Sequence, residues 1–200
     1  MDLLMITGLV IAGIVLIVAV IIAVMLFVFK DILSYTATGS KTLSPAGASA
    51  GQALVVYDTG VSGAAKRAAV KIAGVLQSKG YTVNLAGVRS ATAMSVSGYD
   101  VIVVDGPVYG DKLGSSVQTY LQNLNASQTA KIGVFATGTV APKSNDSAYM
   151  IKFVTNLPDS SPVKVRAAGK LVTAMNGNVI NKTSGHFDKQ CSEFVSALLQ

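Results

Sequence analysis

Residues 99–113 read YDVIVVDGPVYGDKL. The apolar run 101–104 is short and continuous, which is typical of a parallel strand that is buried on both faces. The stretch 106–112 that follows contains glycine and proline and indicates a loop at the carboxyl end of that strand. This segment therefore predicts a strand over 100–105 in an α/β sheet, followed by a loop that can carry binding residues.

The same alternation of apolar runs and helical patterns extends over residues 52–200. The patterns predict four more strands, at 53–57, 81–86 and 131–136, and at 163–167 with 171–175, the last as one strand or a short pair. They predict helices at 64–79, 113–125, 144–157 and 187–199, whereas 87–99 shows no strong helical pattern. Because repeated strand–helix units need right-handed crossovers, we expect an α/β domain with a five-stranded parallel sheet.

Three of the predicted strands are followed by loops rich in glycine, serine, threonine or proline, at 58–63, 106–112 and 137–143. In open parallel sheets, ligands bind beyond the carboxyl ends of the strands, where the strand order reverses. We therefore expect these three loops to form one binding crevice.

Three segments of the domain resemble the flavodoxin family. Residues 55–62 resemble the end of the family's first strand and its Thr-Gly-x-Thr phosphate loop. Residues 99–113 are similar to a strand that ends in Gly-Ser-Pro-Val-Tyr-Gly-Gly-Lys-Leu, and 131–138 to the fourth strand and third loop. The likeness runs with breaks across most of 53–200, and 99–113 is its most specific part.

The resemblance implies the strand order 2-1-3-4-5 and a site for flavin mononucleotide (FMN). It implies that Thr59, Gly60, Ser62 and Gly63 hold the phosphate at the N-terminus of the first domain helix, where the helix dipole favours an anion. It implies that Tyr109 stacks on the flavin ring beside Pro107, Val108 and Gly110, and that Thr137, Gly138 and Thr139 line the other side. It assigns the redox chemistry to the cofactor, with no catalytic side chain and no metal.

Departures from the family pattern leave two functions open. The phosphate loop is about two residues shorter than the family's, Asp58 places a carboxylate beside it, and Asp105-Gly106 replaces the usual Gly-Ser/Thr. A carboxylate close to a phosphate dianion repels it unless its side chain points away. The chain is therefore expected to be an FMN-binding electron carrier or reductase for a redox protein or quinone, or else a flavin-free interaction or assembly module.

An apolar segment precedes the domain. Residues 3–29 contain no charged residue and 24 apolar ones, and as a helix they are long enough to cross a bilayer. A cleaved signal peptide is the competing interpretation, but Met1-Asp2 offers no basic n-region and the apolar run exceeds a signal's usual length. We expect a retained single-span membrane anchor.

The lysines indicate how this anchor is oriented. Lys30 and Lys41 follow the span and no basic residue precedes it, so the positive-inside rule places the C-terminal domain in the cytoplasm. Three glycosylation-type triplets, beginning at Asn125, Asn145 and Asn181, point weakly the other way. Residues 34–51, rich in small residues, are expected to be a flexible linker.

Other features narrow the possible functions and partners. Gly8, Ala12, Ala19 and Ala23 form a small-residue stripe on which a homodimer could form, although scattered small residues are the simpler interpretation. The net charge of +6 fits an acidic partner or anionic lipid headgroups, and no motif predicts nucleic-acid binding. One cysteine, Cys191, and one histidine exclude an internal disulfide framework and multi-histidine metal sites. We expect Cys191 to be a buried helix residue.

Overall fold

The computed structural model describes residues 2–34, 37–110, 112–144, 146–173 and 186–200. It divides the chain into two units, Met1–Tyr35 and Thr36–Gln200. The first unit holds helix α1 (Leu3–Ser34), in which Thr7–Met25 has a mean hydropathy of 3.2 and is long and apolar enough to cross a membrane. The predicted N-terminal helix is thus confirmed as a helix, and it continues five residues beyond Phe29.

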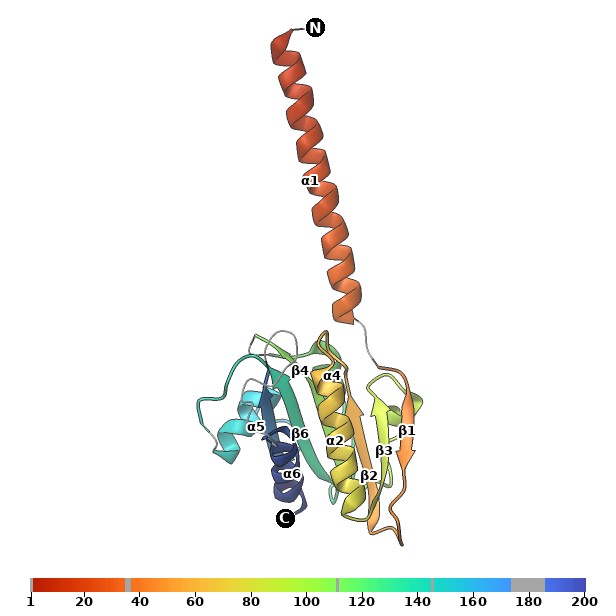
Figure 1. Cartoon of the computed structure of the whole chain (residues 1–200). Coiled ribbons are helices and arrows are strands. Elements are labelled where there is room, and N and C mark those ends of the chain that lie inside the picture. Colours follow the sequence, from red (N-terminus) through yellow and green to blue (C-terminus); the bar gives the residue numbers. More distant parts are fainter. Residues whose placement is uncertain (1, 35–36, 111, 145, 174–185) are drawn as a thin grey trace. The chain divides into compact units, whose positions relative to one another are not determined.

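The second unit is an α/β domain built on one mostly parallel sheet (Figure 1). The strand order is β1-β3-β2-β4-β6-β7, and the short β5 pairs with β4 outside this path. The strands are β1 (Ser40–Leu43), β2 (Gly51–Tyr57), β3 (Tyr81–Gly87), β4 (Val101–Tyr109), β5 (Lys112–Leu113), β6 (Lys131–Gly138) and β7 (Val165–Val172). The five strands β3-β2-β4-β6-β7 are parallel to one another. If these five strands are numbered by their order along the chain, their order across the sheet is the expected 2-1-3-4-5.

The central strands form because their apolar runs can be covered on both faces. Leu54, Val56, Ile102 and Val104 pack into one apolar cluster, and the alternate residues of the same strands pack into another on the opposite face. This division follows from the two-residue period of strand side chains. The continuous apolar runs in the sequence are thus explained by burial between two layers of helices.

Two layers of helices cover the sheet (Figure 1). The helices α2 (Ala64–Ser78) and α6 (His186–Leu199) cover one face, and α3 (Ala91–Met94), α4 (Ser115–Gln122) and α5 (Ser147–Thr155) cover the other. The alanine-rich stripe of α2, which includes Ala65, Ala68 and Ala69, is buried. Cys191 is buried on α6, as the sequence predicts.

Two strands lie outside the predicted five-stranded parallel sheet. The strand β1 pairs antiparallel with β3, from Ser40 opposite Ala86 to Leu43 opposite Val83. The prediction that 34–51 is a flexible linker is therefore wrong for 40–43, which form this edge strand. The strand β5 pairs antiparallel with the end of β4, and the backbone turns between the two.

The chain enters the domain beside the carboxyl end of β3. The Gly87 N–H donates to the Gly39 carbonyl at 2.8 Å, and the Arg89 N–H donates to the Ala37 carbonyl at 3.0 Å. A Cβ at Gly87 would lie 2.3 Å from the backbone of Ala37, so this close approach needs glycine at position 87. The first residues after α1 in the described part of the chain are thus anchored to the sheet.

Candidate functional site

The loop after β2 lies directly against the carboxyl end of β4. The prediction of a loop over 106–112 is wrong for 106–109 and for 112, because β4 continues to Tyr109 and β5 begins at Lys112. A Cβ added to Gly60 would come within 2.9 Å of Pro107 Cβ and 3.1 Å of its Cγ. Gly60 also has a φ of 63°, which a larger residue adopts only at a cost. The pyrrolidine ring therefore requires glycine at position 60, and it brings the first two predicted loops into contact.

Tyr109 connects the same two loops through its hydroxyl group. The Val61 N–H donates to Tyr109 Oη at 3.2 Å, while 43% of the residue's surface remains exposed. Partial burial, with a smaller contribution from the charge of Asp58, raises the pKa of the Tyr109 hydroxyl. Tyr109 thus stays protonated at neutral pH, and its O–H remains able to donate a hydrogen bond of its own.

The third loop meets the second through Gly138. A Cβ at this position would lie 2.7 Å from the carbonyl oxygen of Val108. Thr137 is buried and Thr139 is exposed, so the two threonines do not share one environment. The structure therefore places Gly60, Pro107, Val108, Tyr109 and Gly138 in one continuous row, formed by the first loop and the carboxyl ends of β4 and β6.

The backbone donors of the first loop have acceptors within the chain. The Gly60 N–H donates to Asp58 Oδ1 at 3.3 Å, and the Gly63 N–H donates to the Gly60 carbonyl at 3.3 Å. At the first residue of α2, the Ala64 N–H donates to Ser62 Oγ at 3.4 Å. These bonds are longer than the usual 2.9–3.0 Å, so the loop amides are weakly engaged.

Asp58, the first residue of this loop, is hydrogen-bonded on both of its carboxylate oxygens. Only 5% of the residue is exposed, and Asp58 Oδ2 accepts a hydrogen bond from the Ser116 hydroxyl in the first turn of α4. Its other oxygen accepts the Gly60 N–H, and its own N–H donates to the Asp105 carbonyl at 3.0 Å. The carboxylate is thus tied to the scaffold by two donors.

A family model of the flavodoxin domain matches residues 54–196. This chain belongs to the flavodoxin family. The match covers all five parallel strands, so the resemblance seen in 55–62, 99–113 and 131–138 extends to nearly the whole domain. No curated protein matches the chain.

Solved flavodoxin structures are similar to this domain in fold. An oxidised flavodoxin 2 from Bacillus cereus has a TM-score of 0.50 at 19% identity, and the match covers 74% of this chain and 97% of the other. A short-chain flavodoxin associated with a non-canonical PDU bacterial microcompartment has a TM-score of 0.51 at 15% identity, covering 74% and 96%. At these identities the comparison describes the fold alone.

Sequence reasoning named Asp105 as a departure from the family pattern but did not predict that its carboxyl group is buried. Asp105 lies in β4, fully buried, and neither of its oxygens has a hydrogen-bond partner. Burial raises its pKa well above the ordinary value; the Gly106 and Ala69 amides oppose this rise, although neither forms a well-aligned bond to the carboxylate. The group is therefore neutral over a wider pH range than an exposed aspartate. In the described part of the chain, no three acidic, histidine or cysteine side chains group as metal ligands.

The sequence also gave no signal for the buried cation of Lys170. This residue of β7 is 6% exposed, and its Nζ lacks a hydrogen-bond partner. Burial lowers the pKa of its ammonium group from 10.5 to about 8. The Nζ atom would lie 3.2 Å from a Cβ at Gly138, so the cation lies directly behind the third loop.

Replacing Asp105 should remove a pH dependence of stability. The folded carboxyl group has a raised pKa. Between the pKa of the unfolded state, about 4, and that of the folded state, the folded state therefore binds more protons. Over this pH range the free energy of unfolding falls by up to about 1.4 kcal/mol per pH unit as the pH rises. Asp105→Asn lacks this term, so we expect its free energy of unfolding relative to the parent to increase from pH 4 to pH 7. Urea denaturation at several pH values measures it, and a pH-independent difference would contradict a raised pKa.

Replacing Lys170 should stabilise the domain near neutral pH. Lys170→Met keeps an apolar stem and removes an ammonium group that burial disfavours, so we expect a gain of about 2 kcal/mol at pH 7. Because the folded pKa of about 8 is below the unfolded value, this gain should shrink as pH rises from about 8 to 10.5. Thermal unfolding of both proteins across this range tests the prediction, which fails if the gain is absent or constant.

Proposed function

We propose that the domain binds FMN at the loops after β2, β4 and β6 and transfers electrons through it. The observation that carries this proposal is the contact of Gly60 with Pro107 and of Val61 with Tyr109, in a chain that belongs to the flavodoxin family. These contacts bring the phosphate-loop residues and the aromatic residue implied by the resemblance together at the carboxyl end of the sheet. Flavodoxins typically bind FMN, whose ring accepts and releases one or two electrons.

The residues of the first loop suit a phosphate group. Gly60 and Gly63 both have positive φ, and successive amides in such turns form anion-binding concavities. Phosphate oxygens would replace the long internal acceptors of the Gly60, Gly63 and Ala64 amides, with the hydroxyl groups of Thr59 and Ser62 beside them. One oxygen of the buried Asp58 carboxylate is bonded to Ser116, and the other faces the Gly60 amide, so a phosphate that took this amide would have to displace that oxygen.

The other two loops would hold the ring. The exposed part of Tyr109 offers an aromatic surface for stacking, with Pro107, Val108 and Gly110 shaping the turn. Thr137, Gly138 and Thr139 would line the other side, where the Gly138 backbone approaches Val108. Stacking and backbone hydrogen bonds would orient the ring and adjust its reduction potential.

We further propose that α1 is a membrane anchor and that the domain works at a membrane surface. The apolar segment Thr7–Met25 supports this, although a signal sequence has the same composition. A membrane location would give the flavin access to a quinone or to a membrane-bound redox protein. A cytoplasmic domain follows from the lysines after the span, and a homodimer through Gly8, Ala12, Ala19 and Ala23 stays a prediction.

A flavin-free interaction module is the second candidate function. The amides of Asp58, Gly60, Val61 and Gly63 in the first loop already have acceptors within the chain, so much of the loop is hydrogen-bonded without a ligand. In this case the same fold would present its loops to a protein partner.

Titration of FMN with the purified protein separates these functions. We expect saturable quenching of flavin fluorescence, with binding weakened by about 1–3 kcal/mol in Tyr109→Ala because one stacking ring is lost. Tyr109→Phe keeps the ring and should retain most of the affinity. Tyr81→Ala is the matched control, since Tyr81 begins β3 at the opposite end of the sheet. Absence of saturable quenching in the parent would support the flavin-free function instead.

A further inference from the structure

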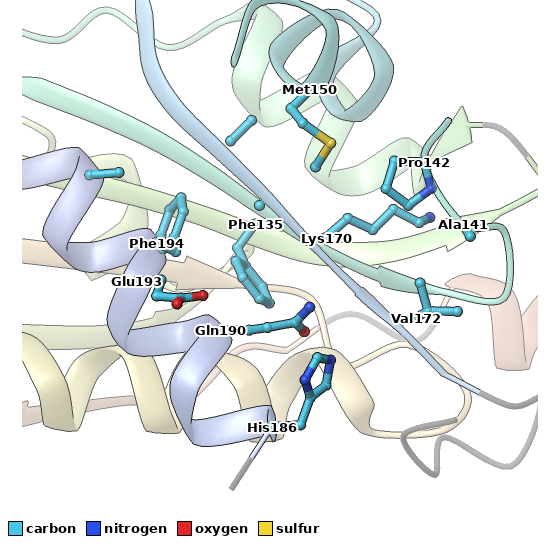
Figure 2. A pocket seen from close by; sticks show the side chains of 13 residues that line it. Phe135, Ala141, Pro142, Met150, Lys170, Val172, His186, Gln190, Glu193 and Phe194 are labelled. Atoms are coloured by element: carbon cyan, nitrogen blue, oxygen red, sulfur yellow. The ribbon is translucent and has the colours of Figure 1, made fainter. Parts of the chain in front are cut away.

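A cavity of about 620 Å³ lies along β7, the last strand of the sheet (Figure 2). Lys170 lines it together with Ala141 and Pro142 from the loop after β6, Met150 from α5, and Val172 from β7. Figure 2 shows the Lys170 side chain extending toward Ala141 and Pro142. This volume extends along both sides of β7, since α6 residues such as Gln190 and Glu193 also line it.

The strand β7 divides the walls of this cavity into two sides. Gly169 faces α6, since a Cβ there would touch the rings of Phe135 and Phe194. Lys170 is the next residue and faces α5 instead, because strand side chains alternate between faces. The ammonium group therefore belongs to the side that Pro142 and Met150 enclose.

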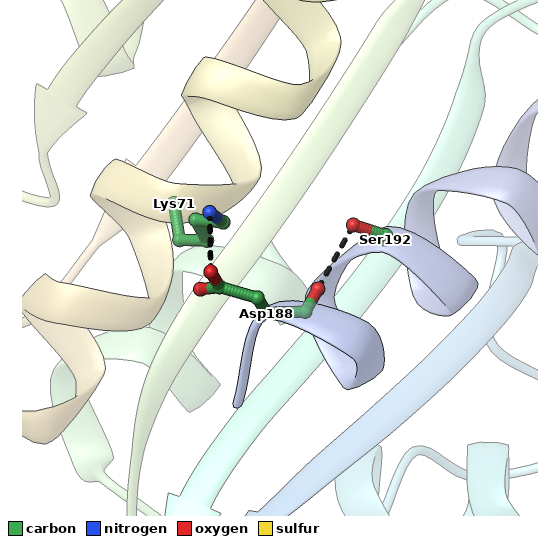
Figure 3. A network of polar contacts seen from close by, with 3 residues as sticks. All are labelled: Lys71, Asp188 and Ser192. Atoms are coloured by element: carbon green, nitrogen blue, oxygen red, sulfur yellow. Dashed lines mark hydrogen bonds and ion pairs between the residues drawn. The ribbon is translucent and has the colours of Figure 1, made fainter. Parts of the chain in front are cut away.

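Lys170 Nζ forms no hydrogen bond or ion pair with a described residue, and the carboxylate of Glu193, which also lines the cavity, belongs to α6 and pairs with Lys189. Its Nζ lies 5.3 Å from the centroid of the Phe153 ring, a favourable contact that compensates only part of the lost hydration. Two ion pairs among the described residues involve other lysines, namely Lys71 with Asp188 (Figure 3) and Lys189 with Glu193. A buried lysine is normally paired, so an unpaired one that lines a cavity indicates a missing negative partner.

We propose that this cavity binds a small monocarboxylate with an apolar body, whose carboxylate pairs with Lys170 Nζ. The number of positive charges favours a monoanion over a dianion. Lys170 is the only lysine or arginine among the described lining residues, so one negative charge of a phosphate dianion would stay buried without a partner. The apolar body lies against Ala141, Pro142 and Met150. This site is partly formed by the third loop, to which Ala141 and Pro142 belong, and its test does not use flavin.

Benzoate and its neutral isostere benzamide test the proposal by calorimetric titration of the full-length protein. We expect benzoate to bind saturably and benzamide to bind at least tenfold more weakly, because only benzoate supplies the missing charge. Lys170→Met should weaken benzoate binding at least tenfold, and Lys170→Gln, a second neutral variant, should do the same. Lys152→Met, which removes an exposed lysine of α5, should leave binding unchanged.

Three results would each contradict the proposed site. The parent could fail to bind benzoate saturably, it could bind benzoate and benzamide equally well, or a folded Lys170 variant could bind benzoate as well as the parent does. Far-ultraviolet circular dichroism of each variant establishes that it is folded. Because FMN is not used, failure here leaves the flavin titration unaffected, and the reverse also holds.

Discussion

The packing of the Pro107 ring against the backbone of Gly60 is the constraint on which the candidate site depends. The strands β2 and β4 are parallel neighbours, so their carboxyl ends, and the loops that follow, emerge side by side. A side chain at position 60 would separate these loops, because the space is filled by the proline ring. With the loops in contact, Tyr109 reaches the Val61 amide, and the first loop and the aromatic residue form one structure.

Two ionisable groups without hydrogen-bond partners lie behind these loops, on opposite faces of the sheet. Asp105 lies on the face covered by α2 and α6, where burial raises the pKa of its carboxyl group and favours the neutral form. Lys170 lies on the α5 face, behind Gly138. Behind the loops there is therefore a carboxyl group whose ionisation is opposed by burial on one side, and a poorly compensated cation on the other.

The sequence predicted the parts of the fold that repeated apolar patterns determine. The runs 53–57 and 101–104 are buried on both faces, as their continuity indicates, and the alanine stripe of α2 is buried at helical spacing. The polar strand β1, Ser-Lys-Thr-Leu, was missed because its pairing with β3 supplies order that its composition does not. The burial of Lys170 was missed for a similar reason, since Phe153 and the loop after β6 create its environment. The motif at 99–113 predicted the contact region of the loops but not the internal acceptors of their amides.

Hydrogen exchange of the Val61 amide tests most directly whether the loops are held together as described. The account predicts slower exchange at Val61 in the parent than in Tyr109→Phe, which lacks the acceptor oxygen. Exchange at Ile102, in the centre of the sheet, should be the same in both proteins. Equal exchange rates at Val61 in parent and variant would show that Tyr109 does not join the two loops, and this would contradict the single site on which the proposed function rests.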